Sequence, residues 1–308
     1  MHPSVHAKTQ PNKPAFIMAS TGETVTYGQL EERSNRGAHL FRKLGLKTGD
    51  GVAIFMENNV HYLPIVWAAQ RAGLYFTCVS SRLTAAEIEY IVNDCGAKVL
   101  ITSEQMGDVA RELGGKLPGV QKFMLGGTMP GYLSGEEAVR QMPATPTADE
   151  SPGTDMLYSS GTTGRPKGVK RALTGGPLAQ PNPLLMLVKM LYQFDENTVY
   201  LSPAPLYHAA PLRYNMAVHG FGGTCIVMEH FEPEQALALI GKYKTTHSQW
   251  VPTMFVRMLK LPEAARKKYD VSAMKVAIHA AAPCPIPVKK QMIEWWGPVI
   301  NESYAASE

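Results

Sequence analysis

The 308-residue sequence has little cysteine and no long uninterrupted apolar run. Its four cysteines, Cys78, Cys95, Cys225 and Cys284, are far apart and form no Cys-x-x-Cys pair. Neither a zinc site nor a redox pair is therefore indicated, and we expect buried, reduced thiols. No apolar run approaches the roughly 20 residues that span a bilayer, and the polar N-terminus lacks the apolar stretch of a signal peptide. These absences predict a cytoplasmic protein.

Charged residues are also sparse, at 18% of the chain, and the formal net charge is only +4. Basic residues spread this thinly do not indicate a nucleic-acid partner, which would favour Lys and Arg clustered on one face. The apolar fraction of 45% is that of an ordinary globular protein and excludes intrinsic disorder. At about 150 residues per domain, the length predicts about two domains or lobes.

Helical and strand patterns alternate along the first half of the chain. Apolar spacing and glycine punctuation predict helices over 26–44, 59–72 and 84–96, and strands over 52–56, 74–79 and 98–101. The helix at 84 opens with Thr84-Ala-Ala-Glu87, the pattern of a capping box. This rhythm predicts an α/β fold with crossover connections and mostly parallel sheets.

The segment 126–153 differs from its surroundings because it is rich in Gly, Pro, Thr and acidic residues. We interpret it as a surface linker between two packed α/β lobes, residues 1–153 and 154–308. In the second lobe the patterns predict strands over 155–159, 199–202, 224–228 and 276–279, and helices over 184–192 and 234–243.

The segment most informative about chemistry is Tyr158-Ser-Ser-Gly-Thr-Thr-Gly-Arg-Pro-Lys-Gly168, which follows a predicted strand. Its hydroxyl side chains, its glycines and Lys167 are what a polyphosphate needs: short donors, close backbone approach and positive charge. A flexible turn without a ligand is the alternative interpretation. The segment is not a Walker A loop, because Pro166 stands five residues after Gly161 where that pattern needs Gly. Dinucleotide-binding, hydrolase-elbow and zincin patterns are absent from the sequence.

This segment resembles the phosphate-binding signature of the adenylate-forming (AMP-binding) superfamily, which includes acyl-CoA synthetases, luciferases and peptide-synthetase adenylation domains. Other segments resemble that family in the same order along the chain. They are Thr26-Tyr27, Arg71-Ala-Gly73, Pro205-Leu-Tyr-His208, Ala280-Ala-Ala-Pro283 and Tyr304-Ala-Ala-Ser-Glu308. The resemblance covers essentially the whole sequence and implies the large N-terminal domain of the adenylate-forming fold.

The resemblance also implies residue roles. The ATP phosphates would lie against Ser159, Ser160, Gly161, Thr162, Thr163, Gly164 and Lys167, and the adenine against Tyr304, Ala305 and the wall Ala280, Ala281, Ala282 and Pro283. Ser307 would face a phosphate, and Thr162 and Glu308 would hold Mg2+, a cation that prefers hard oxygen ligands. Tyr207, His208, Trp250 and Ala280 would contact the acid, with Lys167, His208 and Glu308 as catalytic residues. A structural role for His208, a solvated carboxylate at Glu308 and a plain core position for Trp250 remain the alternatives.

Two departures from the family pattern bear on this expectation. Ala280 and Ala305 stand where the family often has glycine. The family's ribose-binding Asp, hinge and C-terminal domain with its catalytic Lys follow the last of these motifs and are not among the 308 residues. We therefore expect an N-terminal portion of a ligase that lacks its C-terminal domain, binds ATP weakly and adenylates poorly.

The implied reaction is activation of a carboxylic acid by ATP to an acyl-adenylate, followed by transfer to coenzyme A, as in fatty acid metabolism. Around Tyr207-His208 no carboxylate is present to pair with a substrate amine. Small alanines there favour, by resemblance, a medium or long aliphatic, aryl or polycyclic acid. An adenylating enzyme with another acyl acceptor and a non-catalytic nucleotide- or acyl-binding module are the alternatives. Whether the protein forms a homodimer stays open.

Overall fold

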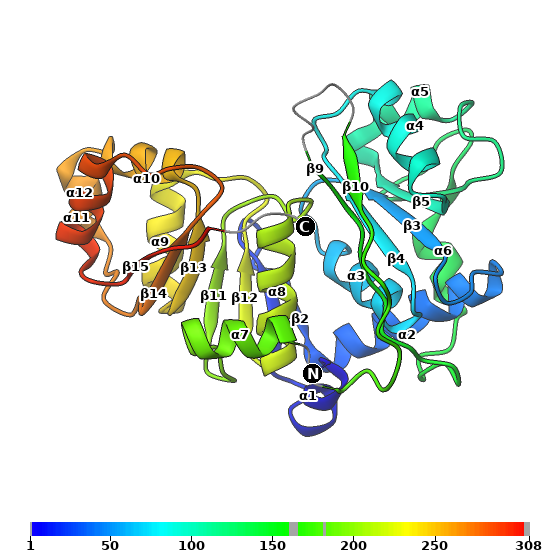
Figure 1. Ribbon diagram of the computed structural model, residues 1–308, viewed down its shortest axis with the longest axis horizontal. Helices are drawn as coiled ribbons and strands as arrows, with labels where there is room; N and C mark the ends of the chain where they lie inside the picture. Colours follow the sequence, from blue (N-terminus) through cyan, green and yellow to red (C-terminus); the bar gives the residue numbers. More distant parts are fainter. Residues whose placement is uncertain (1, 160–165, 181–182, 305–308) are drawn as a thin grey trace. The chain divides into compact units, whose positions relative to one another are not determined.

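The computed structural model describes residues 2–159, 166–180 and 183–304. The described chain forms two compact units. Unit 1 draws on residues 2–27, 183–205 and 210–304, and unit 2 on residues 28–159, 166–180 and 206–209. Each unit is an α/β structure built on its own sheet (Figure 1).

The main sheet of unit 2 has six strands in the order β7-β6-β5-β3-β4-β8, all paired in parallel. The strands β3, β4 and β5 are almost entirely buried, which explains their continuous apolar sequences. The strands are β3 (Gly51–Phe55), β4 (Tyr75–Val79), β5 (Ala97–Ser103), β6 (Gln121–Leu125), β7 (Leu133–Ser134) and β8 (Thr154–Asp155).

Helices cover both faces of this sheet (Figure 1). Leu100 and Phe55 pack with α4 and α5 on one face, whereas Ile101 and Phe123 face α2, α3 and α6 on the other. The helices are α2 (Tyr27–Lys43), α3 (Tyr62–Arg71), α4 (Ala85–Asp94), α5 (Gly107–Leu113) and α6 (Gly135–Arg140), with a 3-10 turn at Glu104–Met106. A separate antiparallel pair, β9 (Leu157–Ser159) and β10 (Lys167–Val169), completes the unit.

The sheet of unit 1 has seven strands in the order β15-β14-β13-β11-β12-β1-β2. Only β2 is antiparallel, and β1 pairs in parallel with β12, so residues near the N-terminus complete a sheet made mostly from the second half of the chain. The strands are β1 (Pro14–Met18), β2 (Thr24–Thr26), β11 (Val199–Ser202), β12 (Thr224–Val227), β13 (His247–Trp250), β14 (Val276–His279) and β15 (Ile300–Glu302).

One core of unit 1 lies between this sheet and helices on one of its faces. Leu201 and Ile226 of the sheet pack with apolar side chains of α9, α10 and α12, including Trp296. Tyr200, the neighbour of Leu201, instead packs near Tyr214 of α8. The helices are α1 (Ser4–Thr9), α7 (Pro183–Tyr192), α8 (Ala209–Phe221), α9 (Pro233–Tyr243), α10 (Pro252–Leu259), α11 (Glu263–Lys268) and α12 (Ile286–Trp296).

The structure confirms the predicted α/β class and mostly parallel sheets. The strands at 199–202 and 276–279 have the predicted bounds, and Thr84 and Glu87 form the predicted capping box. Cys78, Cys95 and Cys225 are buried free thiols, as expected, while Cys284 is partly exposed. Within the described ranges, no helix is long and apolar enough to cross a membrane.

The structure divides the chain at other positions than 153–154. Residues 126–153 pack on unit 2 rather than forming a linker, because side chains of α2 bind their backbone carbonyls. Asn35 donates to the Ala144 carbonyl at 2.7 Å, and Arg36 donates to the Met142 carbonyl at 2.7 Å. The strand β8, just after this segment, pairs with β4 of the same unit.

Candidate functional site

The ends of the predicted phosphate-binding segment are paired strands. Ser159 of β9 lies opposite Lys167 of β10, and Tyr158 lies opposite Gly168. The pair is attached to α4: the Tyr158 hydroxyl donates to an oxygen of Asp94, and the Tyr90 hydroxyl donates to the carbonyl of Pro166, just before β10, at 3.4 Å. Lys167 is exposed to solvent. The hairpin therefore holds both ends of the segment in a fixed register on a buried sheet.

Gly168 has a packing reason to be glycine. A Cβ atom placed there would lie 2.8 Å from both Met156 Cε and Tyr158 Cζ, closer than side-chain carbons pack. Beyond β10 the chain stays attached to the sheet, because the Tyr75 hydroxyl donates to the Arg171 carbonyl at 2.7 Å. The Lys170 ammonium also lies 4.6 Å from the centroid of the Tyr75 ring.

Several residues predicted for the site lie outside the described residues. They are Ser160, Gly161, Thr162, Thr163 and Gly164 of the phosphate-binding segment, and Ala305, Ser307 and Glu308 near the end of the chain. The predicted magnesium ligands Thr162 and Glu308 are thus among them. In the parts of the chain that are described, no group of three or more His, Cys, Asp or Glu side chains could hold a metal ion.

Tyr207 and His208 belong to unit 2 although α8, which follows them directly, belongs to unit 1. The buried Asn58 holds this short segment in place, because its Oδ1 accepts a hydrogen bond of 2.8 Å from the Leu206 backbone N–H. Asn58 follows β3, so the segment lies near the carboxyl end of a central parallel strand, where α/β proteins commonly bind ligands. Sequence reasoning missed Asn58; its position just after a buried strand was the available signal.

The imidazole of His208 is exposed on one side and packs on Tyr207 on the other, with ring centroids 4.5 Å apart. Partial burial lowers the pKa of His208, and the positive charge of Arg82 lowers that pKa further. The ring is therefore neutral at pH 7 and can donate or accept a hydrogen bond without carrying charge. Arg82, also missed from the sequence, brings a cation to the surroundings of this histidine.

In unit 1 the predicted adenine wall follows β14 directly. The Ala280 N–H donates to the Trp250 carbonyl at 3.1 Å, which continues the sheet by one residue. Ala281 then takes a φ of +74°, in the left-handed region that disfavours residues with a Cβ. Ala281, Ala282 and Pro283 are exposed to solvent. The wall residues thus form an open, strained turn at the carboxyl end of a strand.

Tyr304 follows β15, the neighbour of β14, and its side chain is 101% exposed. A fully exposed aromatic ring at a strand end is free to stack on a planar ligand. Trp250 differs from this arrangement: it is completely buried, and its indole N–H donates to the Ser248 hydroxyl. Its ring packs edge-on against Trp296. Trp250 therefore lies in the core of unit 1, and its contact with the acid stays a prediction.

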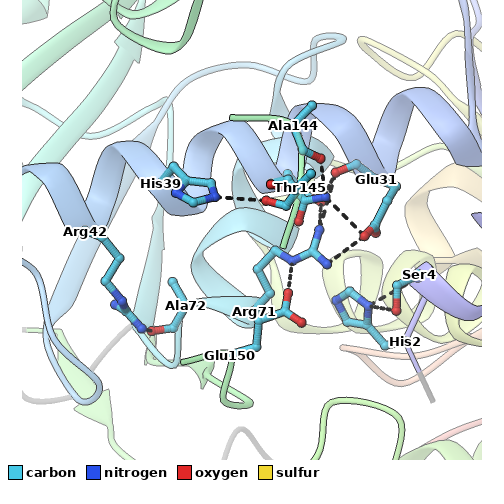
Figure 2. Close-up of polar contacts among 12 residues, drawn as sticks. His2, Ser4, Glu31, His39, Arg42, Arg71, Ala72, Ala144, Thr145 and Glu150 are labelled. Atoms are coloured by element: carbon cyan, nitrogen blue, oxygen red, sulfur yellow. Dashed lines mark hydrogen bonds and ion pairs between the residues drawn. The ribbon is translucent and has the colours of Figure 1, made fainter. Parts of the chain in front are cut away.

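Arg71, which belongs to the segments resembling the family, has a structural role. It is completely buried in α3, where its guanidinium binds Glu31 at 2.8 Å and Glu150 at 2.7 Å. A third bond of 2.8 Å reaches the Ser34 hydroxyl. Figure 2 shows the guanidinium between the two carboxylates. This network joins α2, α3 and the segment before β8.

Comparisons with known proteins agree with this architecture. A sequence profile described as AMP-binding enzyme matches residues 4–308. The fatty acid–acyl-carrier-protein ligase ScoC of Streptomyces coeruleorubidus is 29% identical over 280 residues, which are 91% of this chain and 52% of that protein. The long-chain-fatty-acid–CoA ligase FadD13 of Mycobacterium tuberculosis is 28% identical, over 91% of this chain and 54% of that protein.

Among solved structures, the N-terminal domain of FACL13 from Mycobacterium tuberculosis superimposes with a TM-score of 0.82 at 23% identity, over 99% of this chain and 75% of that chain. This similarity shows the fold. The chain spans about half the length of the curated relatives it matches. The family profile nevertheless covers nearly all of its residues, and the chain belongs to the AMP-binding enzyme family.

Proposed function

We propose that this protein binds ATP along the β9–β10 hairpin and uses it to convert a carboxylic acid into an acyl-adenylate, which then passes its acyl group to coenzyme A. The observation that carries the proposal is the hairpin itself. It pairs Ser159 with the exposed Lys167 and so holds the two ends of a hydroxyl- and glycine-rich segment together. Family membership supports the assignment of this segment to a nucleotide.

In the first half-reaction a carboxylate oxygen bonds to the α-phosphorus while the bond to pyrophosphate breaks. Negative charge accumulates on the phosphate oxygens, so the catalyst must position the reactants and stabilise charge. The Lys167 ammonium supplies positive charge to these oxygens. Mg2+, proposed as a cofactor, would screen the same charge when bound. In the second half-reaction the thiol bonds to the acyl carbon and AMP leaves.

His208 is proposed to orient the attacking carboxylate. Its imidazole is neutral at pH 7 because burial and Arg82 lower its pKa, so it can donate one hydrogen bond without forming an ion pair that would blunt the nucleophile. The tight packing of the ring on Tyr207 fixes its orientation. Tyr304 and the alanine wall are proposed to contact the adenine.

The acid is proposed to be an aliphatic or aryl acid without an α-amine. The segment Tyr207-His-Ala-Ala-Pro-Leu212 contains no carboxylate that would pair with an ammonium group. Two relatives whose names specify fatty acids, ScoC and FadD13, support this class.

The test of the proposal is acid-dependent ATP–pyrophosphate exchange by the 308-residue protein across a panel of acids from acetate to dodecanoate, with cinnamate and alanine included. We expect exchange to rise with acid size, to be lowest with alanine, and to fall at least tenfold in His208→Ala. The matched control His230→Ala alters an exposed histidine of unit 1 with no assigned role. Equal exchange by both variants, or a preference for acetate, would contradict the assignment.

The acyl acceptor requires a separate assay, because one relative is named for an acyl carrier protein and another for CoA. Free coenzyme A is added to protein that has formed acyl-adenylate, and thioester is measured by mass spectrometry. Thioester formation with free CoA supports the proposed acceptor. Thioester formed only on a phosphopantetheinyl carrier protein would overturn it, and ATP binding without any exchange would indicate a non-catalytic module.

A further inference from the structure

A cavity of about 310 Å3 lies inside unit 2, between the sheet and helices α2, α3 and α6. None of its lining residues belongs to the β9–β10 hairpin or to the Tyr207-His208 segment. At about 30 Å3 for each water-sized volume, the cavity holds about ten non-hydrogen atoms. It therefore has the size of a small-molecule site but is separate from the residues proposed to bind ATP and the acid.

The walls of the cavity are mostly apolar. Leu40 and Phe41 of α2, Ile65 of α3, Phe123 of β6 and Val139 of α6 all line it. Residues of α2 enter the lining with helical spacing, so one stripe of that helix faces the cavity. Burying an alkyl or aryl group against these side chains is favourable by the hydrophobic effect.

Two arginines of the same stripe, Arg33 and Arg36, also line the cavity. The guanidinium of Arg36 has partners within the protein: it binds Glu32 at 2.9 Å and the carbonyls of Arg140 and Met142. Arg33 is half-buried, and among the described residues its guanidinium has no hydrogen-bond or ion-pair partner. A lone guanidinium beside an apolar cavity is suited to bind a carboxylate in bidentate fashion.

Acidic side chains also line this region of unit 2. A second cavity, of about 300 Å3, shares His61 and Leu125 with the first and is lined by Glu57 and Glu104. Glu136, in the first turn of α6, is held by the Gly126 backbone N–H at 2.7 Å. The carbonyls that bind Arg36 come from the last residue of α6 and beyond it. The carboxylate of Glu136, which also lines the first cavity, therefore has a backbone partner, whereas the Arg33 guanidinium has none among the described residues.

We propose that this cavity is a second ligand site that binds a small amphipathic carboxylate, with the carboxylate on Arg33 and the hydrocarbon chain among Leu40, Phe41 and Val139. The chain length that fits is about that of octanoate. Binding there needs neither ATP nor the residues of the proposed reaction, so the site can be tested independently of the adenylating activity.

The experiment uses the 308-residue protein without nucleotide and an octanoate analogue that carries a photoreactive diazirine near its methyl end. After irradiation, mass spectrometry maps the labelled peptides, and titration with unlabelled octanoate gives the affinity at each labelled position. Three variants are compared with the wild type: Arg33→Gln, Val139→Phe to fill the cavity, and Arg111→Gln as a control. Arg111 is an exposed arginine of α5 that pairs with Asp108 and does not line the cavity.

We expect labelling of peptides from α2, α3 and α6, with octanoate about tenfold weaker in Arg33→Gln and unchanged in Arg111→Gln. Competition by 1-octanol, which lacks the carboxylate, should be equal in wild type and Arg33→Gln. Labelling confined to other peptides, or octanoate affinity unchanged in Arg33→Gln, would overturn the proposal. If His208→Ala loses acid-dependent pyrophosphate exchange but keeps this labelling, the result supports a second site that is independent of the adenylating activity.

Discussion

Two polar regions of unit 2 use their charged side chains differently. Around Arg71 the guanidinium is completely buried and binds two carboxylates and a hydroxyl of the same unit. At the β9–β10 hairpin the charged side chain of Lys167 is exposed, and backbone pairing holds the two strands together. Both regions resemble the AMP-binding family in sequence, yet the guanidinium of the first is buried and the ammonium of the second is exposed.

This difference separates residues that hold the fold from residues available to a ligand. A buried guanidinium whose donors are already bonded cannot turn to a substrate without leaving its partners unpaired. Exposed groups on a rigid support can change partners at little cost. The comparison predicts large effects on stability in the first class of residue and small effects on stability in the second.

The largest expected effect is at Arg71. In Arg71→Met the carboxylates of Glu31 and Glu150 lose their cation in a half-buried site, and breaking such a pair costs about 3–5 kcal/mol. We expect the free energy of unfolding, measured by urea denaturation, to fall by about that amount. Arg111→Met, which removes an exposed pair, should change it by less than about 0.5 kcal/mol. A decrease of less than about 1 kcal/mol in the free energy of unfolding of Arg71→Met would contradict the structural role given to Arg71.

A buried histidine of unit 1, His219, should make stability depend on pH. Burial lowers the pKa of His219 to about 4, although a contact with the Ala15 carbonyl opposes the shift. Because the unfolded state, with a pKa of about 6.5, binds the proton first, this histidine's contribution to stability declines as pH falls from about 6.5 to about 4. The loss is about 3 kcal/mol.

The measurement is urea denaturation of the wild type and of His219→Gln at several pH values between 7 and 4. Glutamine can still donate to the Ala15 carbonyl but does not titrate. We expect the stability difference between the two proteins to shift by about 3 kcal/mol across this range. A difference that is independent of pH would show that His219 does not titrate as its burial requires.

Gly168 tests whether packing, and not only charge, determines stability at the hairpin. In Gly168→Ala the new methyl group meets the side chains of Met156 and Tyr158 at 2.8 Å. We expect a loss of about 2 kcal/mol, typical of overpacking, measured by urea denaturation. Gly115→Ala is the matched control, since no atom lies within 4 Å of a Cβ placed there. Equal effects of the two substitutions would contradict the close packing of β9 on β10.

The smallest expected effect is at Ala281, where the substitution should raise stability instead of lowering it. The φ of +74° costs a residue with a Cβ about 1 kcal/mol relative to glycine. Ala281→Gly should therefore raise the melting temperature slightly, by the equivalent of about 1 kcal/mol, whereas Ala282→Gly should lower it or leave it unchanged. A lower melting temperature for Ala281→Gly would mean that the turn is not strained.

Much of the secondary structure could be predicted because its signals are local. The run Val199–Ser202 is a buried strand with the predicted bounds, and the Thr84–Glu87 capping box needs only four consecutive residues. The pairing of β1 with β12 could not be predicted, because it joins segments about 200 residues apart. The segment 126–153 resembled a linker in composition, but its carbonyls are bound by distant side chains such as Asn35 and Arg36.

At the candidate site, motifs such as Tyr158–Gly168 and Tyr207-His208 let the sequence name candidate residues, and the ligands of these residues stay predictions. The motif did not reveal how these residues are held. Asn58 fixes Leu206 through a contact between positions 148 residues apart, and Arg82 acts on His208 through space. Trp250 was predicted to contact the acid, and its indole is completely buried. Sequence pattern identifies reactive groups, while burial and long-range contacts decide which of them face a ligand.

The most direct test of the central claim compares ATP and adenosine binding in wild type and Lys167→Met by isothermal titration calorimetry. Removing the ammonium should weaken ATP binding about tenfold and leave adenosine binding unchanged, because adenosine carries no phosphate. ATP affinity that is the same in both proteins, or an equal loss for ATP and adenosine, would contradict the assignment of the β9–β10 hairpin to the triphosphate.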